Sequence, residues 1–145
     1  MNMSASCLFC RIASGKVAGT TLIYTSEKYA VFKDHKPVAQ HHYLVVPKDH
    51  FGKISTLTKE NINMIKEMEQ IGKQVLENNV NFDSGTNINQ DSLLGFHWPL
   101  CLVDHLHMHA IYPASAMSRF NRSVVFSRKL SFGTVDMALE LLSKK

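Results

Sequence analysis

The amino-acid sequence predicts an α+β fold in which a five-stranded antiparallel sheet carries one long packed helix and a C-terminal helix. Three observations support this class. Short runs rich in β-branched and aromatic residues alternate with turn residues, one long segment repeats apolar residues every three or four positions, and no repeat or low-complexity tract interrupts them. The length of 145 residues is that of one ordinary domain.

The first half of the chain contains the first three predicted strands. Residues 22–24 and 29–32 are β-rich runs, and the polar turn between them predicts a hairpin. Residues 42–47 follow as an apolar run ended by a proline, which predicts a buried third strand. Before these strands, residues 7–14 form a short apolar segment or helical turn that Gly15 closes. Together the three strands are expected to form an antiparallel meander.

A long amphipathic helix is predicted over residues 57–79. Apolar residues recur there at steps of three or four, and charged residues occupy the opposite side. Thr58 is the expected N-cap, and Glu60 lies in the first turn, where a negative charge is favourable. The apolar stripe expected to pack on the sheet consists of Ile62, Ile65, Met68, Ile71 and Val75.

The second half of the chain supplies the remaining elements. Residues 86–89 predict a fourth strand, residues 91–99 a loop, and residues 102–111 the last strand. The chain is then polar until a helical pattern resumes at residues 135–142. This last pattern predicts the C-terminal helix.

The composition is that of a single globular domain. With 45% hydrophobic and 19% charged residues, and no apolar run near the roughly 20 residues that span a bilayer, no membrane partner is expected. We expect one domain over residues 1–145, with its core at residues 7–113 and an extension at residues 114–145. The N-terminus has no secretory signature, so the expected location is the cytoplasm, with the nucleus as an additional location.

Charge and cysteine content narrow the partners further. The net charge of +4, with the histidines counted neutral, favours anionic ligands. Lys and Arg form no dense cluster interleaved with aromatic residues, so a nucleic acid is not an expected partner. The three cysteines argue against a structural disulfide in a chain without an export signal. Cys7 and Cys10 have the spacing of a metal-binding or redox pair, and Cys101 is interpreted as a small hydrophobic residue.

Three histidines alternate along the last predicted strand. Side chains two residues apart share one face of a strand, so His105, His107 and His109 would line one face while Leu106 and Met108 point into the core. The first and third imidazoles would lie about 13 Å apart, too far to share one metal ion. Core packing alone does not require three aligned imidazoles. Nucleophilic and acid–base chemistry at an anion is therefore favoured, with a zinc site and a structural role as the alternatives.

This run resembles the His-φ-His-φ-His-φ-φ signature (φ, an apolar residue) of the histidine-triad nucleotide-binding proteins. The resemblance extends from about residue 7 to residue 113, in matching order and spacing, and it implies the histidine-triad (HIT) fold. A further motif is similar to the subgroup that comprises the third Hint-type protein of animals and the aprataxins. The matching motifs are CLFCRI at 7–12, FKDHKP at 32–37, HYLVVPKDH at 42–50 and, for the subgroup, LGFHWP at 94–99.

The resemblance implies catalytic roles for three histidines. His107, the central one of the triad, is the implied nucleophile, which forms a nucleotidyl–imidazole intermediate that water then hydrolyses. His109 is implied to hydrogen-bond the phosphate or the leaving nitrogen, which needs a proton because an amide anion is a poor leaving group. His42 lies at the position that supports the catalytic face.

Nucleotide-binding residues are implied in the same way. Asp34 would accept hydrogen bonds from the ribose hydroxyl groups. Phe32 and Tyr24 are candidates for the nucleobase pocket. His35 stands where relatives commonly have an aliphatic residue at that pocket, so the base preference of this chain is an open question.

On the phosphate side, the resemblance implies one asparagine and one further histidine. Asn89, or Asn87 on the same face of the predicted strand, would supply the asparagine. His97 would supply an extra phosphate contact, with a solvent-exposed loop histidine as the alternative. Two residues depart from the family pattern: Leu102 stands where relatives often have a serine, and Asp104 is an unusual acidic residue directly before the triad.

The resemblance also implies a metal site. In zinc-bearing members of the family the paired cysteines bind the metal together with two histidines, which correspond here to Cys7, Cys10, His50 and His105. Such a four-ligand set is typical of structural zinc, so no catalytic cofactor is expected, and activity is expected to survive loss of the metal in protein that stays folded. A redox pair and two buried thiols are the alternatives.

The implied function is hydrolysis of the P–N bond in nucleoside 5′-phosphoramidates, with a purine nucleotide of the AMP type as substrate. The implied assembly, as in the Hint branch, is a homodimer. The rival enzyme is an aprataxin-type deadenylase of nucleic-acid ends, although residues 114–145 contain no cysteine for the zinc finger of aprataxins. The rival from another class is a nucleotide-binding regulatory protein with vestigial activity.

Overall fold

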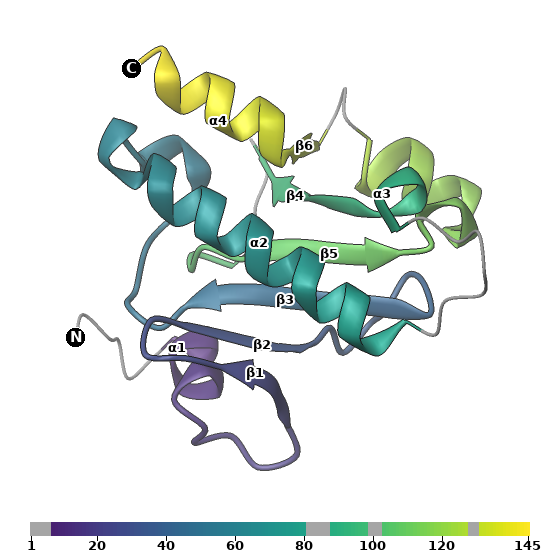
Figure 1. The fold of residues 1–145 in the computed structure, drawn as a ribbon, viewed down its shortest axis with the longest axis horizontal. Coiled ribbons are helices and arrows are strands. Elements are labelled where there is room, and N and C mark those ends of the chain that lie inside the picture. Colours follow the sequence, from purple (N-terminus) through teal and green to yellow (C-terminus); the bar gives the residue numbers. More distant parts are fainter. Residues whose placement is uncertain (1–6, 81–87, 99–102, 128–130) are drawn as a thin grey trace.

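One six-stranded antiparallel sheet organises the molecule, in a computed structural model that describes residues 7–80, 88–98, 103–127 and 131–145. The strand order is β1-β2-β3-β5-β4-β6 (Figure 1). The α+β class is confirmed, but the sheet has six strands and not the five expected. The strands are β1 (Leu22–Thr25), β2 (Tyr29–Lys33), β3 (His41–Pro47), β4 (Leu93–His97), β5 (Met108–Tyr112) and β6 (Phe132–Thr134).

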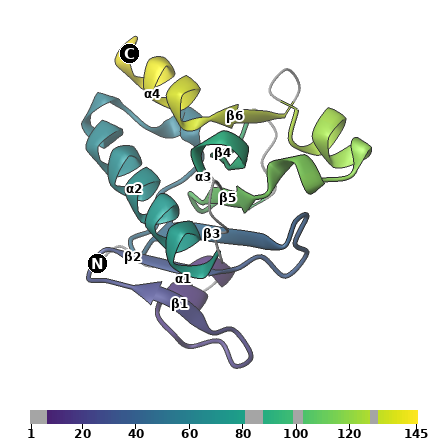
Figure 2. The same ribbon diagram turned by 45° about the vertical axis from the view of Figure 1, so that its right-hand side comes forward.

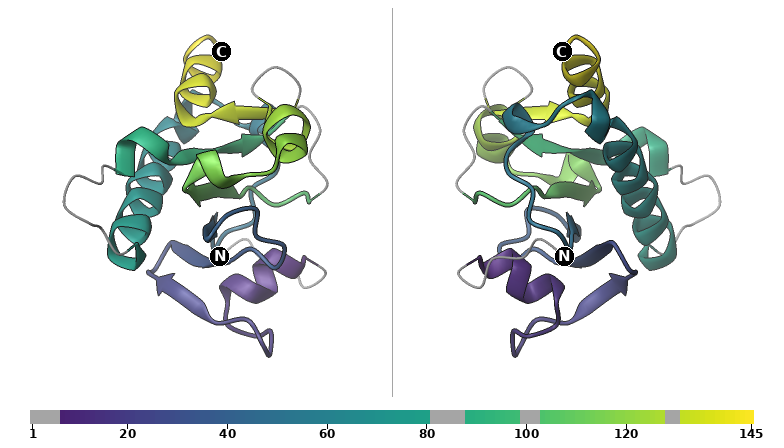
Figure 3. Two further views of the ribbon diagram at one scale, coloured as in Figure 1. Left: turned by 90° about the vertical axis from the view of Figure 1, so that its right-hand side faces the viewer. Right: turned by 90° about the vertical axis from the view of Figure 1, so that its left-hand side faces the viewer.

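Helices lie on both faces of this sheet. The long helix α2 (Ile62–Asn79) and the C-terminal helix α4 (Val135–Ser143) pack on one face and on each other. The short helix α1 (Leu8–Ala13) and the turn Asn121–Val125 lie on the opposite face, as the edge-on views of Figure 3 show. A further short helix, α3 (Ile88–Asp91), directly precedes β4 (Figure 2). None of the described helices combines the length and the apolar character needed to cross a bilayer.

The main hydrophobic core lies between the sheet and the helices α2 and α4. Gly72 allows α2 to approach the sheet closely, because a Cβ atom there would lie 2.5 Å from Cε of Met108 and 2.9 Å from Cδ2 of Leu94. Met108 stands between two histidines of the triad, so α2 packs directly behind them. Buried residues of this core include Val31, Val45, Ile65, Met68, Val75, Met108 and Leu142.

The long helix begins later than its periodicity predicts. Thr58 caps a 3-10 turn, Lys59–Asn61, and its backbone N–H donates to the side-chain oxygen of Asn61 at 2.9 Å. The α-helix itself starts at Ile62. This reciprocal cap satisfies backbone groups that the first turn leaves without partners inside the helix.

Two strands lie where the sequence predicts none. Strand β4 occupies most of the segment expected to be a loop, and β6 lies in the polar tail. A Cβ atom on Gly95 would lie 2.2 Å from the carbonyl oxygen of Gly133 and 2.7 Å from the ring of Phe132. The glycine that favours a loop in the sequence is therefore the residue that allows β4 and β6 to pair.

The chain before the triad also differs from the expectation. The strand predicted at residues 86–89 is wrong for Ile88 and Asn89, which belong to α3, and its first two residues lie outside the described residues. The last predicted strand starts only at Met108. The described residues before Met108 do not pair with a neighbouring strand, because the backbone N–H of Leu106 instead donates to the carbonyl of Phe51 at 2.7 Å.

Candidate active site

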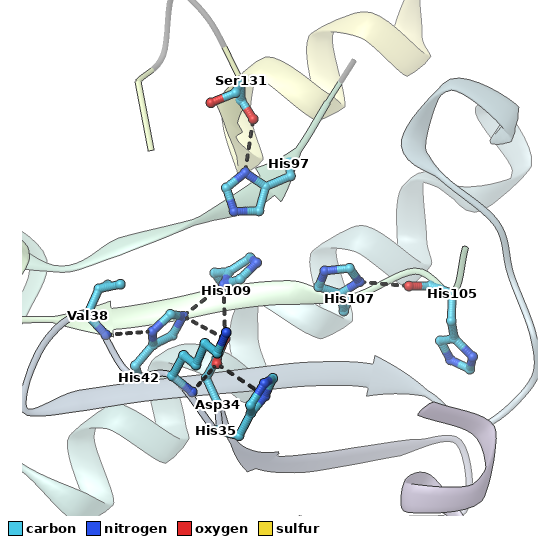
Figure 4. Close-up of polar contacts among 10 residues, drawn as sticks. Asp34, His35, Val38, His42, His97, His105, His107, His109 and Ser131 are labelled. Carbon is cyan, nitrogen blue, oxygen red and sulfur yellow. Dashed lines mark hydrogen bonds and ion pairs between the residues drawn. The ribbon is translucent and has the colours of Figure 1, made fainter. Parts of the chain in front are cut away.

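Four histidines and one aspartate gather on the sheet face opposite α2 (Figure 4). We call them the imidazole cluster. His42 comes from β3, His97 from β4 and His109 from β5, whereas His107 directly precedes β5 and Asp34 directly follows β2. Leu44 on β3 and Gly95 on β4 both pair with His109. His42 and His97 each lie two residues from one of these partners, so their side chains lie on the same face of the sheet as that of His109. His42, His107 and His109 are buried.

The hydrogen bonds of His42 assign its protonation and that of His109. The backbone N–H of Val38 donates to Nδ1 of His42 at 3.1 Å, so in the neutral ring the proton lies on Nε2. That nitrogen lies 2.8 Å from Nδ1 of His109 and donates to it. His109 must then carry its own proton on Nε2. This Nε2–H group is buried and has no hydrogen-bond partner among the described residues.

His107 has the opposite arrangement of ring nitrogens. Its Nδ1–H donates to the carbonyl oxygen of His105 at 2.7 Å, which leaves Nε2 unprotonated in the neutral ring. Burial lowers the pKa of His107, which favours that neutral form. An unprotonated imidazole nitrogen is a nucleophile, whereas the Nε2–H group of His109 is a donor. The two adjacent rings, 5.3 Å apart between centroids, thus present complementary nitrogens.

Burial dominates the electrostatics of the imidazole cluster. It lowers the pKa of His42 to about 4, although the carboxylate of Asp34, 3.4 Å from His42 Nε2, acts in the opposite direction. Burial and the neighbouring imidazoles hold the pKa of His109 well below its ordinary value. The cluster is therefore neutral imidazole beside one carboxylate at neutral pH.

His97 lies inside the cluster, although the sequence left open an exposed loop position. Its Nδ1–H donates to the carbonyl of Ser131 at 3.0 Å, and its ring centroid lies 4.7 Å from that of His109. The rings of Phe126 and Phe132 pack against both histidines. Ser131, Phe126 and Phe132 come from the C-terminal extension and are not among the site residues that the sequence predicts. A backbone carbonyl and two apolar rings give no motif by which they could have been found.

The predicted nucleotide-binding residues are not all on one face. Phe32 is buried on the triad face, beside the ring of Phe9. Tyr24 instead pairs with Val31 and packs into the core on the α2 face, so these two aromatic residues cannot line one pocket. Asp34 accepts a hydrogen bond from the backbone N–H of Lys36 at 2.8 Å through Oδ1, while Oδ2 faces His42.

Two other predicted positions, His35 and Asn89, lie apart from the buried rings. The side chain of His35 is 86% exposed and lies beside Asp34, with 3.9 Å between Nδ1 and Oδ1. Asn89 is exposed on α3 and does not belong to the imidazole cluster. The alternative asparagine, Asn87, and the departure at Leu102 lie outside the described residues.

The four residues expected to bind zinc meet at one site. The donor atoms of Cys7, Cys10, His50 and His105 all lie within 4.8 Å of one another, and we call this group the thiol–imidazole cluster. Nδ1 of His105 lies 3.3 Å from both sulfur atoms, and Nδ1 of His50 lies 3.3 Å from that of Cys10. Nε2–H of His105 donates to the carbonyl of Pro47 at 2.9 Å, which leaves Nδ1 unprotonated toward the sulfurs.

These distances fit a metal ion. A tetrahedral zinc ion with Zn–S of about 2.3 Å and Zn–N of about 2.0 Å holds sulfur and nitrogen about 3.5 Å apart. Asp34, His42 and His109 also lie close enough together to be considered as ligands. However, the facing nitrogens of those two histidines share a proton at 2.8 Å, which leaves no lone pair on His42 Nε2 for a metal.

Comparison with known proteins identifies the family of the chain. A family model described as "Scavenger mRNA decapping enzyme C-term binding" matches residues 6–124. The chain is 39% identical to a Xenopus tropicalis protein named adenosine 5′-monophosphoramidase HINT3, over 94% of this chain and 87% of that protein. It is 40% identical to the Mus musculus protein of the same name, over 99% and 85% of the two chains.

A solved structure supports the fold. The structure of a zinc-bound histidine triad family protein from Mycobacterium smegmatis aligns with a TM-score of 0.57 at 21% identity, over 96% of this chain and 94% of that one. The matched sequence spans β1 to β5 and the whole triad. The chain therefore belongs to the histidine-triad family of nucleotide-binding proteins, in its Hint branch.

Proposed function

We propose that this protein is an adenosine 5′-monophosphoramidase, which hydrolyses the P–N bond between AMP and an amine. The names of the two vertebrate relatives support the activity. The observation that carries the proposal is the pair of complementary ring nitrogens, the unprotonated Nε2 of His107 beside the unpartnered Nε2–H of His109. Displacement at phosphorus needs a nucleophile and a hydrogen-bond donor that stabilises the negative charge on the phosphoryl oxygens.

In the first half of the proposed reaction, His107 Nε2 attacks phosphorus and the P–N bond breaks, with its electron pair leaving on nitrogen. The His109 Nε2–H group stabilises the charge that develops on the phosphoryl oxygens. A bound anion favours uptake of one proton by the His42–His109 pair, whose charge Asp34 balances. His109 passes that proton to the leaving nitrogen, so the amine departs neutral and the pair returns to its neutral state.

In the second half, water attacks the nucleotidyl–His107 intermediate. The same pair accepts the proton that water loses and releases it to solvent when AMP departs, so each turnover restores the neutral pair. The N–P bond to His107 breaks and AMP is released. No step requires a metal ion at phosphorus.

We further propose that the thiol–imidazole cluster binds one structural zinc ion. Two thiolates and two neutral imidazole nitrogens are ligands that zinc prefers, and the separations of the donor atoms support this assignment. The zinc-bound relative from Mycobacterium smegmatis is consistent with it. When bound, the metal would fix α1 against the chain that carries His105.

The experiment that tests the function is a turnover panel. The whole protein is incubated separately with an AMP-amine phosphoramidate, a dinucleoside polyphosphate and a 5′-adenylated DNA, and AMP release is followed by chromatography. Quenching the protein in alkali during turnover, where an N–P bond to imidazole is stable, should locate AMP on His107 by mass spectrometry. Fastest turnover of the adenylated DNA would instead identify an aprataxin-type deadenylase, and nucleotide binding without AMP release would identify a regulator.

A further inference from the structure

The ring of His107 is held by two neighbours that do not themselves carry out the proposed chemistry. One is the carbonyl oxygen of His105, which accepts its Nδ1–H at 2.7 Å. The other is the ring of Phe9, whose centroid lies 5.1 Å away at an interplanar angle of 88°. This edge-to-face geometry is the preferred contact of two aromatic rings. The first contact fixes which nitrogen bears the proton, and the second restricts rotation of the ring.

Both neighbours are tied to the thiol–imidazole cluster. Phe9 lies on α1 between Cys7 and Cys10, and Cys7 also caps that helix by accepting the backbone N–H of Cys10 at 3.4 Å. His105 contacts both sulfur atoms through its side chain while its own carbonyl holds His107. The ring of Phe9 also contacts that of His105, with 6.1 Å between centroids. The cluster therefore reaches His107 by two routes.

We propose that Phe9 is a positioning residue for the nucleophile, and that the thiol–imidazole cluster anchors both Phe9 and His105 so that its integrity sets the orientation and tautomer of His107. The kinetic part of this proposal rests on the proposed function, whereas the tautomer can be observed without turnover. This coupling would replace the expectation that activity survives loss of the metal in protein that stays folded.

The tautomer of His107 determines how loosening of the thiol–imidazole cluster should change the reaction rate. A neutral imidazole holds one proton, and His107 can attack phosphorus through Nε2 only while that proton is on Nδ1. A ring released from His105 and Phe9 can turn and can exchange its proton to Nε2, which leaves no nucleophilic nitrogen toward phosphorus. Loosening the cluster should therefore lower kcat more than it raises KM.

The first experiment uses Phe9→Leu, which keeps an apolar side chain and removes the aromatic edge. An edge-to-face pair contributes about 0.5–1.5 kcal/mol, so we expect kcat to fall about two- to thirteenfold with KM changed less than about twofold. In protein labelled with ¹⁵N-histidine, the His107 signals should change from one tautomer to a mixture, with His107→Asn providing their assignment. Ile12→Val is the matched control, because Ile12 lies on the same helix and in the same apolar cluster as Phe9.

The second experiment uses His50→Ala. His50 contacts Cys10 and the ring of His105 but belongs to neither route directly. Zn²⁺ is titrated into the reduced whole protein and into the variant, and binding, unfolding temperature and the His107 tautomer are followed together. We expect the variant to lose tight Zn²⁺ binding and to show the same mixture of His107 tautomers as Phe9→Leu.

Two outcomes would overturn the coupling. A Phe9→Leu protein with raised KM, unchanged kcat and an unchanged His107 spectrum would make Phe9 a wall of the nucleobase site only. A folded His50→Ala protein that fails to bind Zn²⁺ but keeps the single His107 tautomer would show that the cluster is purely structural. Absence of turnover in the wild type, with the tautomer change still present in both variants, would refute the proposed function and leave the coupling intact.

Discussion

The thiol–imidazole cluster and the imidazole cluster both contain histidines, but they arrange the ring nitrogens differently. In the thiol–imidazole cluster the donor atoms converge, since Nε2–H of His105 is occupied by Pro47 and Nδ1 is turned to both sulfurs. In the imidazole cluster the rings are linked in series, from the N–H of Val38 through His42 to His109. Converging lone pairs suit a cation, whereas a series of donors that ends in an unpartnered N–H suits an anion.

The difference arises in the backbone and not in the imidazoles. A single backbone group, the carbonyl of Pro47 or the N–H of Val38, decides which nitrogen of the first ring is free. The assignment of His109 follows from that of His42, while His97 and His107 each have a backbone carbonyl of their own as partner. The residue type alone therefore does not distinguish a metal ligand from an acid–base group, and its backbone partner does.

The largest expected effect concerns His107, whose role as nucleophile distinguishes the imidazole cluster from the thiol–imidazole cluster. We expect His107→Asn to reduce kcat by about 10³-fold or more, because the side chain keeps a hydrogen-bonding group but loses the attacking nitrogen. AMP release and equilibrium binding of AMP are measured together, and binding should stay within a few-fold. His41→Asn is the control, since His41 contacts Tyr43 outside the cluster. More than about a tenth of wild-type kcat in His107→Asn would refute the assignment.

The two clusters should also differ in what they contribute to stability. Cys7→Ser keeps an N-cap for α1 but removes a soft ligand, so we expect loss of zinc and a fall in Tm of about 10 °C. Asp34→Asn, in the other cluster, should leave zinc content and most of the Tm unchanged. Metal analysis and calorimetry measure both. Equal unfolding temperatures for the zinc-free and the original protein would exclude a structural metal.

Acid should weaken the fold through the imidazole cluster. The pKa of His42 is about 4 in the folded state and about 6.5 in the unfolded chain, so between these values only the unfolded chain binds the proton. The free energy of unfolding should therefore fall as the pH is lowered from about 6.5 to about 4, by on the order of 3 kcal/mol from this residue. The charged and titratable groups that face His42 are Asp34, His97 and His109.

Urea unfolding at pH 7, 5.5 and 4.5 measures this slope. His42→Asn should flatten it, because the variant has no proton to take up at this position. The exposed His35→Asn should keep the wild-type slope. An unchanged slope in His42→Asn would mean that other groups carry the acid sensitivity.

The smallest expected effect concerns the aromatic wall of the imidazole cluster. The ring of Phe126 lies 5.9 Å from that of His42 and 5.4 Å from that of His109, between centroids. Phe126→Leu should admit water and raise the pKa of His42 toward its ordinary value, by less than about one unit. Phe120→Leu is the matched control, since Phe120 is exposed on the same segment. NMR titration of the ring protons compares them, and equal shifts in both variants would exclude a local effect.

The sequence predicts well what depends on periodicity and spacing. The alternating histidines identify the triad, the C-x-x-C pair identifies the two thiols, and β-rich runs identify the first three strands. The other members of the two clusters, Asp34, His42, His50 and His97, are implied only by the family resemblance. The sequence fails where backbone geometry decides. Gly95 favours a loop although it lies in a strand. Tyr24 is a candidate for the nucleobase pocket by resemblance, although its pairing with Val31 turns it to the α2 face.

The deeper failure concerns the triad itself. Strict alternation predicts a row of three equivalent imidazoles, whereas only His109 lies within β5. His105 turns to the sulfurs and His107 hydrogen-bonds its carbonyl, an arrangement that a regular strand would not allow. Hydrogen bonds such as that of Leu106 to Phe51 leave no signal in a single sequence, because any residue can supply a backbone group.

Gly95 offers a way to interpret the sequences of other members of the family. Its missing side chain is what lets β6 pair with β4, and β6 directly follows Ser131, whose carbonyl holds His97. A homologue with any larger residue at the aligned position has no room for this sixth strand in the same register. The residue at this one position of β4 therefore indicates whether the C-terminal tail of a homologue can pair with β4 and contact the imidazole cluster.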